Sequence, residues 1–149
     1  MPVTRRSAAI LALSVAAFGK RLAAAEERAP VDVAIVLAND VSRSINDDEF
    51  TLQRQGYAAA IGNPKLLEAI RTGLRGAIAL LFAEWAGEGE EKVVVDWTTI
   101  RGEADAEKFA AALLAAPRSY LGRTAIGSAI DFAMGLIGEG GVVADRRVI

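Results

Sequence analysis

Hydrophobic positions divide the chain into alternating strand-like and helix-like segments. Nearly continuous apolar runs of strand length cover Val31–Ala38 and Ala77–Trp85, which is typical of strands that are buried on both faces of a sheet. A third strand is expected over Lys92–Trp97, directly after the turn sequence AGEGEE. Because that connection is short, we expect the second and third strands to pair antiparallel. A last strand is expected to begin at residue 142 and to run to residue 149.

Segments with helical spacing of their apolar residues lie between these strands. Helices are expected over Asp47–Ile61, Pro64–Thr72, Ala104–Ala116 and Ala125–Ile137. The most regular stripe belongs to the last helix, where apolar residues recur at a spacing that indicates an amphipathic helix: Ile126, Ile130, Ala133, Met134 and Ile137.

The order of these elements predicts an α/β layer fold with a mostly parallel sheet. Ligands of such sheets bind beyond the carboxyl ends of the strands. The loop Asn39–Ser44 follows the first strand directly and carries Asp40, Ser42 and Ser44. We therefore expect the functional site at the end of this strand.

Length and composition narrow the possible chemistry. The chain has 149 residues, enough for one domain, and 52% of them are hydrophobic. It contains neither cysteine nor histidine, which excludes disulfides, thiolate zinc sites and catalytic pairs of Ser or Cys with His. A bound metal must therefore rest on oxygen ligands, which favours Mg²⁺, Mn²⁺ or Ca²⁺.

The first 25 residues are predicted to be a secretory signal peptide. A basic start, an apolar run too short to span a bilayer, and Ala23–Ala25 before Glu26 form the expected pattern. Arg5 and Arg6 favour twin-arginine export, with an ordinary signal peptide as the alternative. We expect a periplasmic or secreted protein, residues 26–30 as a linker, the domain over 31–149, and no membrane span in the mature chain.

Charge argues against nucleic acid as a partner. The expected signal peptide, residues 1–25, carries four cations and no acidic residue. The rest of the chain carries 13 cations and 19 acidic residues. An acidic domain of this kind is a poor binder of phosphate backbones.

The D-x-S-x-S sequence at positions 40, 42 and 44 has a physical reason to bind a cation. Alternate residues of an extended segment point the same way, so a carboxylate and two hydroxyls can converge if the loop curls. Thr124, just before the last helix, is a second source of a hydroxyl. The alternative is structural, because Asp, Ser and Thr at these places are also common as turn residues and helix caps.

At these residues the chain resembles the von Willebrand factor A domain, and more narrowly an uncharacterised bacterial family of exported proteins similar to it. The resemblance is carried by VDVAIVLANDVSRSI, DDEFTLQRQGYAAAI, AEWAGEGEEKVVVDW and LGRTAIGSAIDFA. It implies a Rossmann-like three-layer sandwich, with a mostly parallel sheet and one short antiparallel edge strand. It also implies a metal-ion-dependent adhesion site, in which Asp40, Ser42, Ser44 and Thr124 hold the ion.

The last acidic ligand of that site has no match in this sequence. In the family it follows the fourth strand, whereas this sequence ends at Ile149, inside the expected strand. The resemblance thus implies a domain whose C-terminal part is missing and whose Mg²⁺, Mn²⁺ or Ca²⁺ binding is weak. Asp131 and Asp145 are not expected to substitute, because one lies within a helix and the other precedes the strand.

We therefore expect a non-enzymatic, exported adhesion-type module that binds a protein partner through a divalent ion and an acidic side chain of the partner. Alternatives are a Mg²⁺-dependent phosphoester hydrolase that uses Asp40, and a non-functional truncated remnant. Arg43 and Arg123 either attract the acidic partner or are solvated loop charges. The acidic turn of Glu88, Glu90 and Glu91 is expected to be a solvated hairpin tip.

Overall fold

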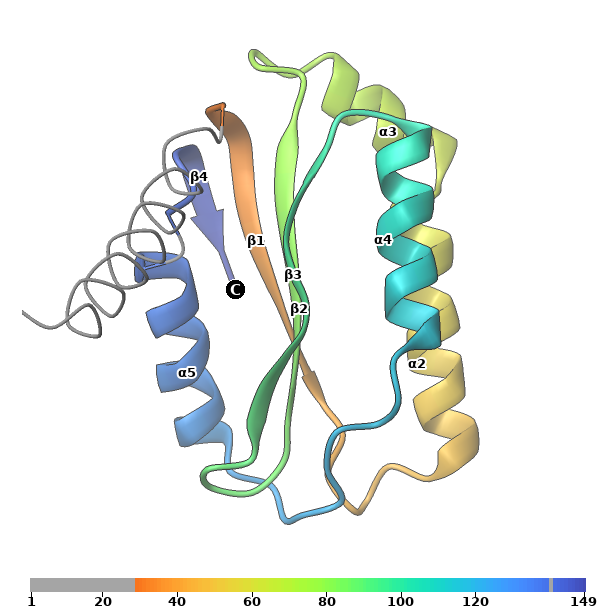
Figure 1. Ribbon diagram of the computed structural model, residues 1–149, viewed down its shortest axis with the longest axis vertical. Coiled ribbons are helices and arrows are strands. Elements are labelled where there is room, and N and C mark those ends of the chain that lie inside the picture. The colour runs from red at the N-terminus through yellow and green to blue at the C-terminus, as the bar shows by residue number, and fades with distance from the viewer. Residues whose placement is uncertain (1–28, 140) are drawn as a thin grey trace, which may run out of the picture.

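A four-stranded sheet forms the centre of the molecule (Figure 1). The computed structural model describes residues 29–139 and 141–149, so the expected signal peptide at 1–25 and most of the linker lie outside the described residues. The strands have the order β3-β2-β1-β4 across the sheet. Their bounds are β1 Val31–Asp40, β2 Ile78–Trp85, β3 Glu91–Ile100 and β4 Ala144–Val148.

Strand β1 pairs parallel with both of its neighbours, β2 and β4, whereas β3 pairs antiparallel with β2 at one edge. This arrangement confirms the expected mostly parallel sheet with an antiparallel edge strand. That edge strand was expected to be short, but β3 is 10 residues long, because it pairs along the whole of β2. The register aligns Asp40 with Trp85, so the carboxyl ends of β1 and β2 lie side by side. The loop that follows β1 and the turn that follows β2 therefore begin side by side.

Helices cover both faces of the sheet. Helices α2 (Asp47–Ile61), α3 (Pro64–Arg71) and α4 (Glu103–Ala115) lie on one face, and α5 (Ile126–Glu139) lies on the other (Figure 1). Each face of the sheet carries an apolar cluster beneath its helices. The cluster under α2, α3 and α4 contains Phe82, Phe109 and Leu113, whereas the cluster under α5 contains Leu81 and Ala133. The three-layer α/β sandwich is thereby confirmed.

Helix α5 does not bury the whole of its apolar stripe. Its buried residues are Ala129 and Ala133, whereas Ile126, Ile130 and Met134 are 60%, 53% and 57% exposed. Apolar residues occur on every side of this helix, so spacing alone did not identify the face that contacts the sheet. The small alanine side chains face the sheet and let the helix approach it closely.

Element boundaries differ from the expected ones by a few residues. Strand β3 runs three residues beyond Trp97, because residues 98–100 continue to pair with the beginning of β2. Asp145 lies within β4 rather than before it. None of the helices in the described ranges is both long and apolar enough to cross a bilayer.

Candidate metal centre

Asp40 is the last residue of β1, and the chain then turns at the carboxyl end of this strand and leads to α2. Ser42 is buried in this loop, with only 1% of its surface exposed. The cap of α2 is Asn46, which forms a capping box with Glu49. The cap interpretation is therefore wrong for Ser42 and Ser44, because the helix has another residue in that role.

The hydroxyl groups of Ser42, Ser44 and Thr124 meet at Ser42 and form a hydroxyl cluster. Its Oγ lies 3.2 Å from the Oγ of Ser44 and accepts a hydrogen bond of 3.0 Å from Oγ1 of Thr124. The first turn of α5 is closed by the N–H of Ala129 onto the carbonyl of Ala125, so Thr124 precedes the helix and directs its hydroxyl to Ser42. The structure thus brings the expected serines and threonine together from two separate loops.

The carboxylate of Asp40 is partly engaged by its own loop. Its Oδ1 accepts a hydrogen bond of 2.7 Å from the backbone N–H of Ser42, which is the geometry of an Asx turn. The turn interpretation of Asp40 is therefore correct for this oxygen. Among the described residues, no hydrogen-bond donor contacts its Oδ2, which leaves that atom available to a cation.

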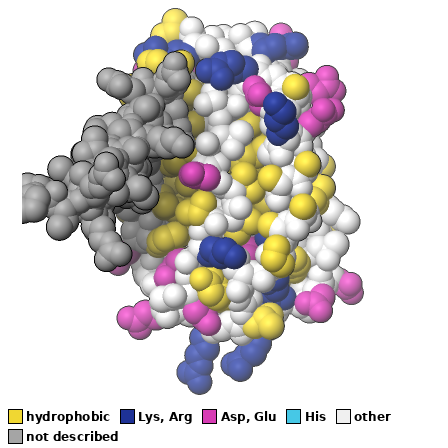
Figure 2. All heavy atoms as spheres, viewed as in Figure 1, with side chains coloured by type: hydrophobic (Ala, Val, Ile, Leu, Met, Phe, Trp, Pro, Cys, Tyr) yellow, Lys and Arg dark blue, Asp and Glu magenta, His cyan; other side chains and the backbone are white. Residues whose placement is uncertain are grey.

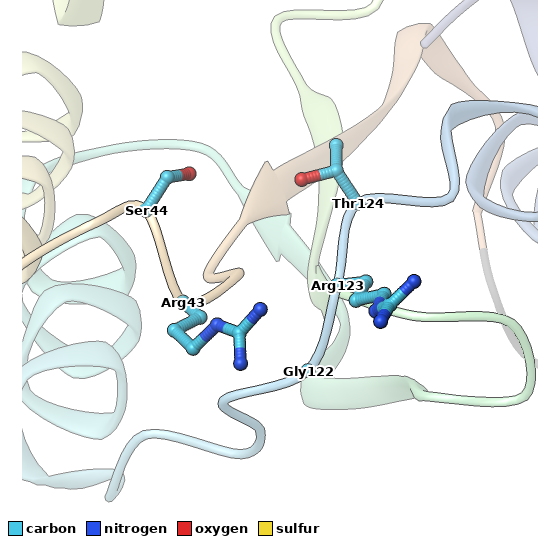
Figure 3. A pocket seen from close by; sticks show the side chains of 5 residues that line it. All are labelled: Arg43, Ser44, Gly122, Arg123 and Thr124. Atoms are coloured by element: carbon cyan, nitrogen blue, oxygen red, sulfur yellow. The ribbon is translucent and has the colours of Figure 1, made fainter.

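An open pocket of about 290 Å³ lies beside the hydroxyl cluster and is lined by Arg43, Ser44, Gly122, Arg123 and Thr124. Figure 3 shows the hydroxyls of Ser44 and Thr124 facing each other across it, one from each loop. A backbone hydrogen bond of 2.9 Å from the N–H of Arg43 to the carbonyl of Gly122 joins the two loops at the pocket.

Arg118 fixes the shape of the loop after β1, and no motif in the sequence indicates this role. Its Nη2 donates to the carbonyl oxygens of Val41, Ser42 and Ile45 at 2.8, 2.9 and 2.8 Å. Its Nε lies 3.2 Å from the carbonyl of Tyr120 in its own loop. One guanidinium therefore holds both loops that supply the hydroxyls.

A buried ion pair supports the same region from within. Glu84 is fully buried, and its Oε1 accepts hydrogen bonds from Nε and Nη2 of Arg54 at 3.2 and 2.6 Å. The other carboxylate oxygen accepts the backbone N–H of Ser119 at 2.9 Å. Since Ser119 lies in the loop between α4 and α5 that leads to Thr124, this pair helps to position that loop. Both residues fall within regular elements, and no motif marks them.

The acidic turn between β2 and β3 is more than a solvated tip. Oε2 of Glu90 accepts the N–H of Gly87 at 2.8 Å, and the same carboxylate occupies the space that a side chain at Gly122 would fill. Glu91 accepts a hydrogen bond from the hydroxyl of Ser128 in α5. The expectation of a purely solvated turn is therefore wrong for Glu90 and Glu91.

The donor set at this corner consists of one carboxylate and three hydroxyls. These hard oxygen ligands are of the type that binds Mg²⁺, Mn²⁺ or Ca²⁺. A single carboxylate, however, supplies little negative charge to the ion. In the described part of the chain, no three acidic side chains cluster closely enough to hold a metal ion. Glu88 and Asp131 line a neighbouring pocket, and Asp145 pairs with Arg75 at the opposite end of the sheet.

Two solved structures show partial similarity to the chain. The von Willebrand factor domain of the type V pili tip protein Mfa5 from Porphyromonas gingivalis matches 79% of this chain and 36% of that one, with 16% identity and a TM-score of 0.46. A structure of three N-terminal domains of the same pilus protein matches 79% of this chain and 19% of that one, with 17% identity and a TM-score of 0.45. The chain thus spans well under half of the length of either structure.

The search of curated proteins found no match to this chain. A family model covers nearly the whole described region, from the residue before β1 to the last residue of the sequence. It includes both loops of the hydroxyl cluster and Arg118. The chain therefore belongs to the family described as protein of unknown function (DUF1194), whose model matches residues 30–149.

Proposed function

We propose that the chain is a non-enzymatic interaction module that binds a protein partner through a divalent ion. The ion is held by Asp40, Ser42, Ser44 and Thr124, and Mg²⁺ is the favoured metal, with Mn²⁺ or Ca²⁺ as alternatives. The observation that carries the proposal is the meeting of hydroxyls from two loops at Ser42, beside an open pocket. The resemblance of these segments to the von Willebrand factor A domain supports the same assignment.

The charge of the site argues for an acidic group on the partner. One carboxylate and neutral hydroxyls leave a divalent ion with excess positive charge and with positions filled by water. A carboxylate from a partner replaces one of these waters and supplies the missing charge. For the same reason, we expect the protein alone to bind Mg²⁺ with a dissociation constant of roughly a millimolar.

We also propose that the domain is exported from the cytoplasm. The predicted signal peptide directs the domain to the periplasm or the cell exterior, where free Mg²⁺ and Ca²⁺ are available to a weak site. A chain without cysteine suits export by either route, because it needs no disulfide formation to fold.

Paramagnetic Mn²⁺ tests the metal assignment without any partner. We expect Mn²⁺ to broaden the NMR amide signals of residues 40–44 and 122–125 first, and excess Mg²⁺ to restore them. Asp40→Asn keeps the acceptor for the N–H of Ser42 but removes the charge, so it is expected to abolish the selective broadening. Asp131→Asn, in the neighbouring pocket, is the matched control and is expected to change nothing. Broadening centred on Glu88 and Asp131 instead, or unchanged by Asp40→Asn, would contradict the proposal.

A further inference from the structure

Two arginines form the walls of the pocket beside the hydroxyl cluster. Arg43 comes from the loop after β1 and Arg123 from the loop before α5, and both side chains are exposed. Within residues 29–139 and 141–149, neither guanidinium takes part in a salt bridge, whereas Arg54, Arg71, Arg75 and Arg118 all do. Figure 3 shows both arginine side chains at the pocket, below the hydroxyls of Ser44 and Thr124.

The loops hold these arginines in a defined relation to each other. The backbone hydrogen bond from Arg43 to Gly122 joins the two loops at the residue before Arg123. Arg118, whose side chain is only 12% exposed, ties the same two loops together from inside. The two guanidinium groups therefore project from a rigid base, and ordering them on a ligand costs only side-chain freedom.

This end of the molecule is not uniformly basic. Asp47, Asp48 and Glu49 begin α2 nearby, and Glu90 lies against Gly122. Lys and Arg side chains nevertheless project at the lower end of the molecule in Figure 2, where the loop after β1 and the loop before α5 lie. A guanidinium without an internal partner is suited to bind a carboxylate in a bidentate manner.

From this arrangement we propose that the partner presents a cluster of at least two carboxylates, as an acidic segment of a protein. One carboxylate reaches the ion, and its neighbours bind Arg43 and Arg123. The inference rests on the proposed function for the first carboxylate, whereas the arginine contacts stand on the pocket itself. Arg43 and Arg123 thus select an acidic cluster over a single acidic residue.

Binding of a fluorescein-labelled oligo-aspartate peptide to the full chain, followed by fluorescence anisotropy, tests this proposal. We expect binding in Mg²⁺ that weakens with added salt, and none for the matched oligo-asparagine peptide. Arg43→Glu and Arg123→Glu are each expected to weaken it about tenfold. Arg101→Glu is the control, because Arg101 follows β3 beside the beginning of β2, at the other end of the sheet, and it is expected to have no effect.

Other results would separate the acidic-cluster inference from the metal proposal or overturn the inference. Binding that needs Mg²⁺ but ignores both arginine variants overturns the acidic-cluster inference and leaves the metal proposal intact. Binding that needs the arginines but persists in EDTA supports the cluster and overturns the metal proposal. Absent binding, or equal loss in Arg101→Glu, overturns the inference. Displacement of the peptide by dextran sulfate at equal charge would show that the pocket takes polyanions in general, which also overturns it.

Discussion

The hydroxyl of Thr124 donates a hydrogen bond of 3.0 Å to the hydroxyl of Ser42, although 82 residues of sequence separate the two. This bond closes the gap between the loop after β1 and the loop before α5. Ser42 is buried, so its hydroxyl has few other partners to replace a lost one. Thr124 therefore helps to hold the two loops together, alongside Arg118 and the backbone hydrogen bond from Arg43 to Gly122.

Replacing Thr124 with Val keeps the shape of the side chain but removes this hydrogen bond. We expect a loss of about 1 kcal/mol in the free energy of unfolding, since a buried hydroxyl loses one of its partners. Urea denaturation followed by circular dichroism measures it. Thr124→Ser retains the hydroxyl and is expected to stay within about 0.5 kcal/mol of the wild type. Equal stability of the Val and Ser variants would mean that the bond contributes nothing.

Removal of the Arg118 guanidinium is expected to be more costly. In Arg118→Met, the carbonyl oxygens of Val41, Ser42 and Ile45 lose a shared charged donor. We expect a loss of about 2–3 kcal/mol in unfolding free energy, from several charge-assisted hydrogen bonds in a mostly buried place. The same urea titration measures this loss.

A matched control for Arg118 is available on α3. Arg71 pairs with Glu68 on the surface, with 63% of its side chain exposed. We expect Arg71→Met to change the unfolding free energy by less than about 0.5 kcal/mol, because exposed ion pairs contribute little. If both variants lose the same stability, then Arg118 has no special role in holding the loops.

The Arg54–Glu84 pair is expected to behave as a coupled unit. Arg54→Met leaves the fully buried Glu84 carboxylate without its charged partner, so we expect a loss of about 3–5 kcal/mol. The double variant Arg54→Met, Glu84→Leu removes both charges and is expected to recover a large part of that loss. Calorimetric or urea unfolding of the two single variants and the double variant measures the coupling. Additive losses would contradict it.

The layered fold was predictable from sequence because strand-length apolar runs and helical spacing are local signals. The convergence of Ser42, Ser44 and Thr124 was predictable because they follow or precede elements at one end of the sheet, and because the resemblance placed Thr124 with the serines. Arg118 was not, since its partners are backbone carbonyls that carry no mark in the sequence. The buried face of α5 was also missed, because that helix is apolar on all sides and the sheet selects its alanines.

Gly122 is expected to resist substitution because of Glu90. A β-carbon at Gly122 would overlap the Glu90 carboxylate, which must then rotate away and lose its hydrogen bond to the N–H of Gly87. We expect Gly122→Ala to lower the unfolding free energy by about 1 kcal/mol. In a Glu90→Ala background, the same substitution is expected to cost almost nothing. Thermal or urea unfolding of the four proteins checks this, and equal costs in both backgrounds would contradict the contact.

The Arg75–Asp145 ion pair makes the stability contributed by strand β4 depend on pH. Nε and Nη2 of Arg75 each donate a 2.9 Å hydrogen bond to Asp145, which lies in β4. These hydrogen bonds lower the pKa of Asp145 below its ordinary value of 3.8, and the pKa of Arg75 is raised by the same pairing. The pair therefore contributes its full stability above the ordinary pKa of the carboxyl, and the contribution is lost as pH falls through the lowered pKa.

We expect the Asp145 carboxyl carbon, followed by NMR, to titrate at lower pH than an unpaired aspartate, and Arg75→Gln to return it to the ordinary range. Both side chains are roughly two-fifths exposed, so added salt is expected to weaken the shift. Arg71→Gln, in the α3 pair, is expected to leave the Asp145 titration unchanged. If Arg75→Gln also leaves it unchanged, the pair does not persist in solution, and β4 is held at this edge by its pairing with β1 and by packing alone.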